Sequence, residues 1–527
     1  MSSIALKEVN LFMKNNRYPR LARLLRIMGT AVLTLLLFAG FLCYFSAAWY
    51  VSVYGRIGFD SVLYTLTQSL SGVQSGLIIQ YLTGAAVPAL AWTAALTLLL
   101  FAPWKKIFKI ILFQKIKLQL FPFKWVFSCC ICVLLSLLLV VHAAFNVQLV
   151  DYIISNMHLS SLYENEYRDP EQIQITFPEE KRNLIYIILE SMETSYLSRE
   201  QGGALEYNLI PELYQLAQDN VNFSHNTDVG GFREVSGASW TVGSIVAQTG
   251  GVPLRTPDGL SDWQNGYGKD GTFLPGLTSL NSMLRDNGYY QALMVGSDAN
   301  FGGRKTYFAT HGVDEIYDIY AARADGIIPR DYFVWWGMED KYLFEYAKQE
   351  ITEIAAMDQP FNFTMLTVDT HHVGGYRCEY CDSTYEENYE NVISCSSRQV
   401  YEFVQWLMQQ DFYENTTVVI TGDHCSMDKG YFTRNVDENY TRHVYNCFLN
   451  AAAEPGRTEN RQFSALDMFP TTLAALGCQI EGDRLGLGTN LFSDQPTLME
   501  RVGYANLCSE LANRTEFYAS KFYAKEK

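Results

Sequence analysis

Three apolar stretches in the first 150 residues constrain this chain more than any other feature of its sequence. They run from Ile27 to about Tyr50, from about Ala85 to Trp104, and from Trp125 to about Leu149. Each is about as long as the roughly 20 residues that a helix needs to cross a bilayer. The first is too long for a removable signal peptide and lacks a good cleavage site after it. The sequence therefore predicts a membrane domain over residues 1–150 with about three transmembrane helices.

Positive charge predicts the orientation of these helices. Five Lys or Arg residues lie between positions 14 and 26, and six lysines lie between positions 105 and 124. Because Lys and Arg favour the cytoplasmic side, the chain after about residue 150 is expected outside the cytoplasm, on a multi-pass membrane protein. One alternative stays open, in which the uncharged stretch Ser61–Leu82 forms a fourth span and reverses the topology. Its many Ser, Thr, Gln and Gly residues and the charge bias favour three spans.

The rest of the chain is acidic. Residues 151–527 contain 27 basic and 54 acidic residues, which gives a formal net charge of −27. Solubility is the simpler interpretation of this charge, and the collection of divalent cations beside an anionic membrane is the alternative. Both interpretations argue against a nucleic-acid partner, because a polyphosphate needs a basic surface.

The amino-acid composition changes within this acidic part, at about residue 183. Residues 151–182 are rich in Glu, Tyr and Asn, and we interpret them as a linker arm. From residue 183 onward, short apolar runs alternate with amphipathic segments such as 209–218 and 397–410. The four clearest runs are Leu184–Leu189, Tyr290–Val295, Phe361–Val368 and Thr417–Ile420. This alternation predicts an α/β domain over residues 183–527, with a mostly parallel central sheet between helices.

Polar residues come directly after each of these four runs. The endings are Glu190-Ser191, Gly296-Ser297-Asp298, Asp369-Thr370-His371-His372 and Thr421-Gly422-Asp423-His424. In open α/β sheets, ligands bind outside the carboxyl ends of the strands. Carboxylates and imidazoles gathered there favour a metal site, with Glu190, Asp423 and His424 as its natural ligands. Such a set suits Mn²⁺ or Zn²⁺, with Mg²⁺ as an alternative.

Each of these candidates also has a purely structural interpretation. Glu190 is equally consistent with an acid at a helix N-terminus, and Asp423 with a helix cap beside an uninvolved His424. The segment 237–254 predicts a tight turn that opens a helix, where a hydroxyl beside backbone N–H groups can meet a phosphate. Within it, Ser239 and Thr241 are nucleophile candidates, and either one also suits a simple N-cap.

Three of the seven cysteines after residue 150 lie close together in the sequence. They are Cys378, Cys381 and Cys395, in a Tyr-rich loop. A zinc ribbon is one interpretation, but a fourth ligand at the usual spacing is missing. We favour one disulfide in this loop, because a compartment outside the cytoplasm permits it.

The motifs of the chain, taken in order, resemble a known family. They are LIYIIL closed by Glu190, SGASWTVGSIVAQTGGVPL, GGRKTYF, TVDTHH, TGDH and LDMFPTTLAALG…RLGLGTNLF. Over roughly residues 183–495 the series resembles the phosphoglycerol transferases of osmoregulated periplasmic glucans. These belong with the lipoteichoic acid synthases in the alkaline phosphatase/sulfatase superfamily. The W-T-V-G and R-L-G-L-G-T motifs are specific, whereas T-G-D-H is found throughout the superfamily.

The resemblance implies roles for individual residues. Thr241 matches the catalytic nucleophile, and His371 matches a histidine near the phosphate. Arg304 matches an arginine that holds the phosphoglycerol group, and His372 is an adjacent alternative to His371 in contacting substrate. The implied metal ligands are Glu190, Asp423, His424 and the Thr241 oxygen. One departure is that the tryptophan which the synthases carry near this arginine is missing from the matching stretch; another is that the synthases usually have five spans.

The resemblance also implies a reaction. Thr241 would attack the phosphorus of phosphatidylglycerol, diacylglycerol would leave, and the phosphoglycerol group would pass to an extracytoplasmic glycan or glycerophosphate acceptor. Mn²⁺ is the expected metal ion, ahead of Mg²⁺ and Zn²⁺. A phosphoethanolamine transferase acting on a cell-envelope glycan or lipid is the alternative, although residues 190–193 do not match that group's Gly-Glu-Thr stretch. A true sulfatase is disfavoured, because no C/S-x-P-x-R motif begins at Thr241.

Overall fold

The computed structural model describes most of the chain. The described residues are 19–55, 58–67, 75–101, 110–112, 116–118, 125–255, 271–332, 334–335 and 337–523. Contacts divide the chain into two compact units. The first consists of Met1–Ser52 and Ser75–Leu149, and the second of Val53–Gln74 and Val150–Lys527.

Three helices near the N-terminus are long and apolar enough to cross a membrane, among the described residues. Helix α2 covers Pro19–Tyr54, and α6 covers Trp125–Asn146. Between them, α4 (Ser75–Tyr81) runs through a π-helical turn (Leu82–Ala86) into α5 (Val87–Phe101). The short strands β1 (Ile110–Leu112) and β2 (Ile116–Leu118) pair antiparallel.

Small residues let the helices of this first unit pack closely. A Cβ added at Gly40 of α2 would lie 3.1 Å from the Ser136 backbone of α6. Leu37, Phe41, Ala89 and Cys132 form the small core between the three helices. Close approach of this kind is how helices associate where no hydrophobic driving force acts between them.

The second of the three helices begins earlier than the sequence predicts. Its apolar window starts at Gly76 rather than at about Ala85. The alternative span Ser61–Leu82 is divided between α3 (Phe59–Thr67) and α4, and residues 68–74 lie outside the described residues. Most of the basic residues on which the orientation prediction rests, including those at 14, 17, 105, 106, 109, 115 and 124, also lie outside them.

A seven-stranded sheet forms the centre of the second unit. Its strand order is β5-β10-β9-β4-β8-β6-β7. The five strands from β9 to β7 run parallel, whereas β10 pairs antiparallel with both β9 and β5. The bounds are β4 Asn183–Leu189, β5 Gly231–Phe232, β6 Tyr290–Val295, β7 Glu315–Tyr317, β8 Phe361–Leu366, β9 Thr416–Gly422 and β10 Val444–Leu449. The predicted α/β class with a mostly parallel sheet is confirmed.

Strand β4 shows why both faces of this sheet are covered. Leu184, Tyr186 and Ile188 belong to one hydrophobic cluster. Ile185 and Ile187, which point the opposite way, belong to a second cluster on the other face. Because successive side chains of a strand alternate between faces, a continuous apolar run such as LIYIIL requires helices on both sides.

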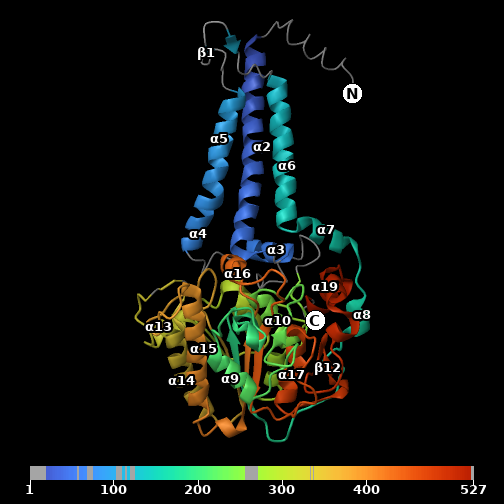
Figure 1. Cartoon of the computed structure of the whole chain (residues 1–527). Coiled ribbons are helices and arrows are strands. Elements are labelled where there is room, and N and C mark those ends of the chain that lie inside the picture. Colours follow the sequence, from blue (N-terminus) through green and yellow to red (C-terminus); the bar gives the residue numbers. More distant parts are fainter. Residues whose placement is uncertain are drawn as a thin grey trace. The chain divides into compact units, whose positions relative to one another are not determined.

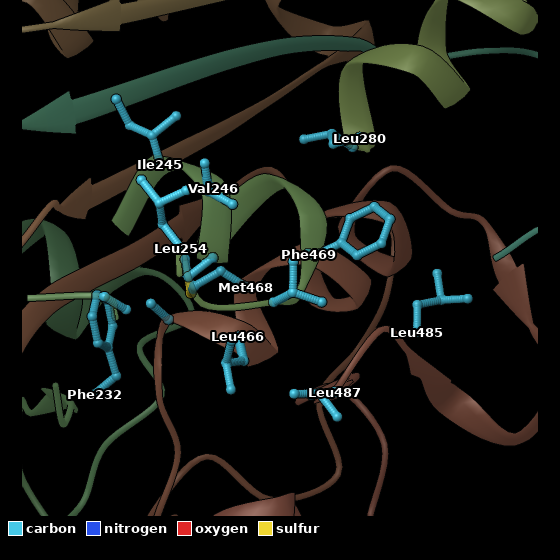
Figure 2. Packing of buried hydrophobic residues seen from close by; sticks show 14 of the residues in the cluster. Phe232, Ile245, Val246, Leu254, Leu280, Leu466, Met468, Phe469, Leu485 and Leu487 are labelled. Atoms are coloured by element: carbon cyan, nitrogen blue, oxygen red, sulfur yellow. The ribbon is translucent and has the colours of Figure 1, made fainter. Parts of the chain in front are cut away.

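Helices supply these two covering layers (Figure 1). Helices α9 (Pro211–Asp219), α14 (Asp340–Ala355) and α15 (Asn388–Leu407) cover one face, and α10 (Thr241–Gly250), α11 (Leu280–Asp286) and α17 (Met468–Ala475) cover the other. Figure 2 shows part of the second layer, where Ile245 and Val246 of α10 and Met468 and Phe469 of α17 belong to one hydrophobic cluster. The remaining helices are α7 Leu149–Met157, α8 Leu162–Glu166, α12 Arg304–Thr310, α13 Ile319–Ala324, α16 Lys429–Asn435, α18 Leu498–Val502, α19 Tyr504–Ala512 and α20 Glu516–Phe522.

The segment interpreted as a linker arm carries structure of its own. Residues 151–182 contain most of α7, all of α8 and the short strand β3 (Ile175–Thr176). Strand β3 pairs antiparallel with β11 (Gln479–Ile480), and Arg168 bridges to Gly486 between β12 (Arg484–Leu485) and β13 (Gly488–Thr489). These pairings tie the segment to the C-terminal part of the same unit.

Candidate active site

Two neighbouring parallel strands bring three predicted ligands together. Glu190 follows β4 directly, and Asp423 and His424 follow β9, which pairs with β4 in parallel up to Leu189 and Gly422. One ligand atom from each of the three residues lies within 4.8 Å of the others. All three side chains are buried. The register of β4 and β9 thus assembles the carboxylate–carboxylate–imidazole set that the strand endings predict.

The Asp423 carboxylate is only half satisfied by the protein. Its Oδ1 accepts hydrogen bonds from the backbone N–H groups of Ser191 and His424, both at 2.8 Å. Its Oδ2 is buried and has no hydrogen-bond partner. That oxygen lies 3.2 Å from His424 Nε2. A buried carboxylate oxygen without a donor is costly unless a cation faces it.

The His424 ring is fixed by its other nitrogen. Nδ1 lies 2.9 Å from the Cys425 carbonyl oxygen, so Nδ1 carries the hydrogen and Nε2 is turned toward the carboxylates. Nε2 lies 3.6 Å from Glu190 Oε1. Orientation of an imidazole by a backbone carbonyl is the usual second contact of a metal-binding histidine.

The charges of this cluster are those that a cation would balance. Burial, with the charge of Glu190, raises the pKa of Asp423 to about 7. Burial alone would lower the pKa of His424, but the carboxylates of Asp423 and Glu190 outweigh it and raise that pKa to about 9. A proton held on Nε2 partly offsets the carboxylates, and a divalent cation would replace that proton. The residues therefore fit a divalent metal ion.

Thr241 is the first residue of α10. Trp240, before it, is extended (φ −148°, ψ 159°), and no side chain caps the helix. Gly237 has a φ of +80°, and a Cβ there would lie 2.7 Å from Pro253 and 2.8 Å from the Leu254 carbonyl oxygen. A glycine turn thus places Thr241 at the start of the helix. The capping alternative for Ser239 or Thr241 is not the arrangement found, because the cap residue is Trp240.

The Thr241 hydroxyl points into the carboxylate–imidazole cluster. Its Oγ1 lies 3.3 Å from His424 Nε2 and 3.5 Å from Glu190 Oε2. Glu190 itself is not at a helix N-terminus, since a turn follows it and its backbone N–H donates to Thr367 Oγ1 at 3.0 Å. All four predicted metal ligands therefore lie in one cluster.

Arg304 begins α12 and is 2% exposed. Its Nε donates to the Phe301 carbonyl oxygen at 3.0 Å, and one of its terminal nitrogens donates to Ser297 Oγ and to the Asp298 carbonyl oxygen, both at 2.8 Å. Ser297 and Asp298 follow β6, so Arg304 is attached to the same edge of the sheet as the cluster. Its positive charge lies close enough to His371 to add to the lowering of the His371 pKa that burial causes.

His371 and His372 follow β8, the strand on the other side of β4. Their rings stack with centroids 4.4 Å apart. His371 Nδ1 lies 2.7 Å from the His372 carbonyl oxygen. Burial lowers the pKa of His371 to about 4, which makes its ring neutral at pH 7. Trp335, far from the arginine motif in sequence, packs edge-on against His371 with centroids 5.8 Å apart.

Three charged residues near the cluster, one of them fully buried, were not found by the sequence analysis. Glu193 is fully buried, forms an ion pair with Arg442 and accepts from the Ser426 N–H at 2.9 Å. Glu234 accepts from the Cys425 N–H at 2.8 Å, and burial raises its pKa to about 7. Both acids thus hold the segment that follows His424. The ES-x-E spacing of residues 190–193 was visible in the sequence, but no local signal marks Glu234 or Arg442.

A second pair of buried carboxylates holds the loop after β8. Asp340 accepts from the N–H groups of Val368 and Asp369 at 2.8 and 3.2 Å. Asp369 Oδ2 accepts in turn from the Asp340 N–H at 3.1 Å. This reciprocal pairing fixes the two residues that precede Thr370 and His371.

A mostly parallel sheet between helix layers, with an acid–acid–histidine cluster at the carboxyl ends of its strands, defines an α/β protein with a candidate metal-dependent active site. The chain belongs to the sulfatase family, whose family model matches residues 182–478.

Named relatives agree with this membership. The chain is 32% identical over 336 residues to a phosphoglycerol transferase I of Xanthomonas campestris pv. campestris, across 62% of this chain and 45% of that protein. It is 27% identical over 345 residues to a phosphoglycerol transferase I of Escherichia coli, across 62% of this chain and 41% of that protein. The match thus spans less than half the length of these relatives.

Solved structures include a lipoteichoic acid synthase of Listeria monocytogenes. That protein is 18% identical, with a TM-score of 0.47, across 61% of this chain and 79% of the other.

Proposed function

We propose that this chain is a metal-dependent phosphoglycerol transferase anchored in a bacterial membrane, with its second unit outside the cytoplasm. In this proposal phosphatidylglycerol is the donor, and the acceptor is a hydroxyl of an extracytoplasmic glycan or glycerophosphate polymer. The observation that carries the proposal is the Thr241 hydroxyl, which lies 3.3 Å from His424 Nε2 and 3.5 Å from Glu190 Oε2. The relatives named phosphoglycerol transferase I support the choice of transferred group.

The four clustered residues would hold the metal. Glu190, Asp423, His424 and the Thr241 oxygen offer three oxygens and one nitrogen, for which Mn²⁺ is the expected ion and Mg²⁺ or Zn²⁺ the alternatives. When bound, the ion supplies a positive charge that favours the deprotonated hydroxyl and offsets charge on phosphoryl oxygens.

Thr241 would act as the nucleophile. Its Oγ1 forms a bond to the phosphorus of the donor, and the bond between that phosphorus and the diacylglycerol oxygen breaks. A second attack, by an acceptor hydroxyl, would then break the Thr241–phosphorus bond and restore the threonine. The position of Thr241 at the start of α10 favours this role, because the backbone N–H groups there attract a phosphate.

His371 would act on the leaving oxygen, and Arg304 would bind the negatively charged phosphoglycerol group. The diacylglycerol oxygen takes up one proton as it leaves, equal to the one that Thr241 loses, and His371 would protonate or stabilise that leaving oxygen. Since His371 Nδ1 is hydrogen-bonded to the His372 carbonyl oxygen, Nε2 is the nitrogen that would exchange a proton. Arg304 would bind the phosphoglycerol group through its guanidinium, and His372 would support the ring of His371 by stacking.

The intact mass of the purified full chain in detergent tests this proposal. After incubation with phosphatidylglycerol and Mn²⁺, the wild type is expected to gain the mass of one glycerophosphoryl group. Thr241→Ser, which keeps a hydroxyl, should gain the same mass more slowly, whereas Thr241→Ala should gain none.

Two results would contradict the proposal. A gain from phosphatidylethanolamine alone would instead support the phosphoethanolamine transferase. Full transfer activity of Thr241→Ala to an added glycan acceptor would exclude the covalent route through this residue.

A further inference from the structure

A cluster of three cysteines lies outside the candidate active site. Cys378 and Cys381 sit in the loop between β8 and α15, and Cys395 is in the second turn of α15. Cys378 and Cys395 are 5% and 1% exposed, and Cys381 is half-buried. All three are free thiols, so the predicted disulfide is not found. The remaining question is what holds three sulfurs together in this way.

The spacing of the sulfurs is that of metal ligands. Cys378 Sγ lies 3.5 Å from Cys381 Sγ and 3.8 Å from Cys395 Sγ. All three sulfur atoms lie within 4.8 Å of one another. Thiolates bound to a tetrahedral zinc ion at about 2.3 Å are separated by about 3.8 Å. The three sulfurs therefore already surround a point where one such ion fits.

The backbone of the loop holds two of the sulfurs close together. The Cys381 N–H donates to the Cys378 carbonyl at 3.2 Å, which closes a tight turn over the C-x-x-C segment. This turn keeps Cys378 Sγ and Cys381 Sγ 3.5 Å apart, and Cys395 of α15 lies beside them.

Side chains of α15 supply further donors around the cluster. Gln399 Nε2 lies 3.4 Å from Cys395 Sγ. Arg398 lies 4.0 Å from the same sulfur and also donates to the Tyr380 carbonyl oxygen at 2.6 Å. Its other terminal nitrogen is paired with Asp382 at 2.8 Å. Arg398 thus ties the C-x-x-C turn to the helix beside Cys395, as outer contacts of metal sites do.

We propose that Cys378, Cys381 and Cys395 form a second metal site, which binds one thiophilic divalent ion of the Zn²⁺ class through three thiolates. Binding releases the thiol protons and leaves a fourth position for water or another small ligand. Soft sulfur ligands separate this site from the oxygen- and nitrogen-rich cluster around Glu190.

The proposed site would anchor the loop that begins at the active site. Only six residues separate His371 from Cys378, and within them the Tyr376 N–H donates to the Asp369 carbonyl at 2.7 Å. Tyr376 also stacks on Trp335, which packs against His371. An ion at the three thiols would therefore fix the far end of the loop that carries both histidines.

Cobalt spectroscopy of the full chain in detergent tests the proposal. The chain is purified without reductant, freed of metal with a chelator, and titrated with Co²⁺. We expect sulfur-to-cobalt charge-transfer absorption that saturates at one ion per chain and disappears when Zn²⁺ is added. This signal requires thiolate ligands, so metal at Glu190, Asp423 and His424 does not produce it, and it does not depend on transfer activity.

Matched variants assign the signal to residues. Cys378→Ser, Cys381→Ser and Cys395→Ser should each lose the absorption, whereas Cys508→Ser, at a half-buried cysteine elsewhere in the same unit, should keep it. Because the wild-type titration decides by itself, a variant that fails to fold does not leave the question open.

Two results would overturn the proposal. A native mass lower by two hydrogens and restored by reductant, with no cobalt signal, would show a disulfide in this loop. If Cys378, Cys381 and Cys395 can all be alkylated and no cobalt signal appears, the three thiols form a cluster that binds no metal.

Discussion

Two pairs of buried carboxylates lie at the same edge of the sheet and are treated by the protein in opposite ways. Asp340 and Asp369 receive N–H groups from each other's backbone and from Val368. In the other pair, Glu190 and Asp423, one oxygen of Asp423 has no donor and faces His424. Both pairs are buried, and they differ in how many donors the backbone supplies to their oxygens.

This difference separates a structural carboxylate pair from a ligand pair. Where backbone amides fill the oxygens, the hydrogen-bonding capacity of the carboxylates is satisfied within the chain and the pair fixes a loop. Where an oxygen is left without a donor, the chain keeps a repulsive charge that a cation relieves. The comparison therefore predicts that substitutions in the two pairs affect different measurements.

The largest expected effect is on transfer activity and metal binding. Asp423→Asn should lower metal affinity by more than about 100-fold and the transfer rate by about 10³-fold, because it removes a charged ligand. Asp340→Asn is the matched control and should keep metal affinity, since its hydrogen bonds go to Val368 and Asp369 and none goes to the cluster. Calorimetric Mn²⁺ titration of both variants checks this, and equal losses in the two would break the distinction.

The next effect concerns pH. Burial raises the pKa of Asp340 from 3.8 to about 7, so the folded chain holds this proton more tightly than the unfolded chain does. The resulting stability is fully present below pH 3.8 and is lost as the pH rises through about 7.

Urea unfolding of the full chain in detergent and chelator, followed by fluorescence, measures this change. The free energy of unfolding of the wild type should fall more steeply between about pH 4 and about pH 7 than that of Asp340→Asn. Parallel curves for the two proteins would show that Asp340 does not titrate in this range.

The smallest effect compares two buried serines. Ser191 Oγ donates to Glu190 Oε1 at 2.9 Å, and Ser195 Oγ donates to Glu193, which is already paired with Arg442. Each Ser→Ala substitution should cost about 0.5–1.5 kcal/mol of stability. Only Ser191→Ala should also weaken Mn²⁺ binding, by about 10-fold. Equal Mn²⁺ affinities in the two variants would place Glu190 outside the metal site.

The central strands could be predicted from the sequence because their signal is local. Strands β4, β6, β8 and β9 are continuous apolar runs that end in polar residues, and the structure places all four in the parallel part of the sheet. Strands β5 and β7 have two and three residues, which is too few for any periodicity to show. Strand β10 is antiparallel and delivers none of the predicted ligands, so the pattern of strand endings did not mark it.

The site could be predicted only as far as its residues follow strands or recognisable motifs. Glu190, Asp423 and His424 follow strands, and the motif around Thr241 is distinctive. Glu234 contacts the Cys425 backbone 191 positions later in the chain, and Trp335 reaches His371 from another loop. Contacts of this kind depend on the folded arrangement of loops and leave no local pattern in the sequence.

The position of β4 in the sheet has a consequence for the synthesis of this protein. Its two partners are β8 and β9, which begin about 170 and 230 residues further along the chain. At a synthesis rate of about 5–20 residues per second, β4 waits roughly 10–30 s for its first neighbour. During that time LIYIIL presents two unpaired edges, which is the kind of segment that aggregates. With the second unit outside the cytoplasm, as we propose, β4 would need a holding chaperone or a delayed release until β9 has emerged.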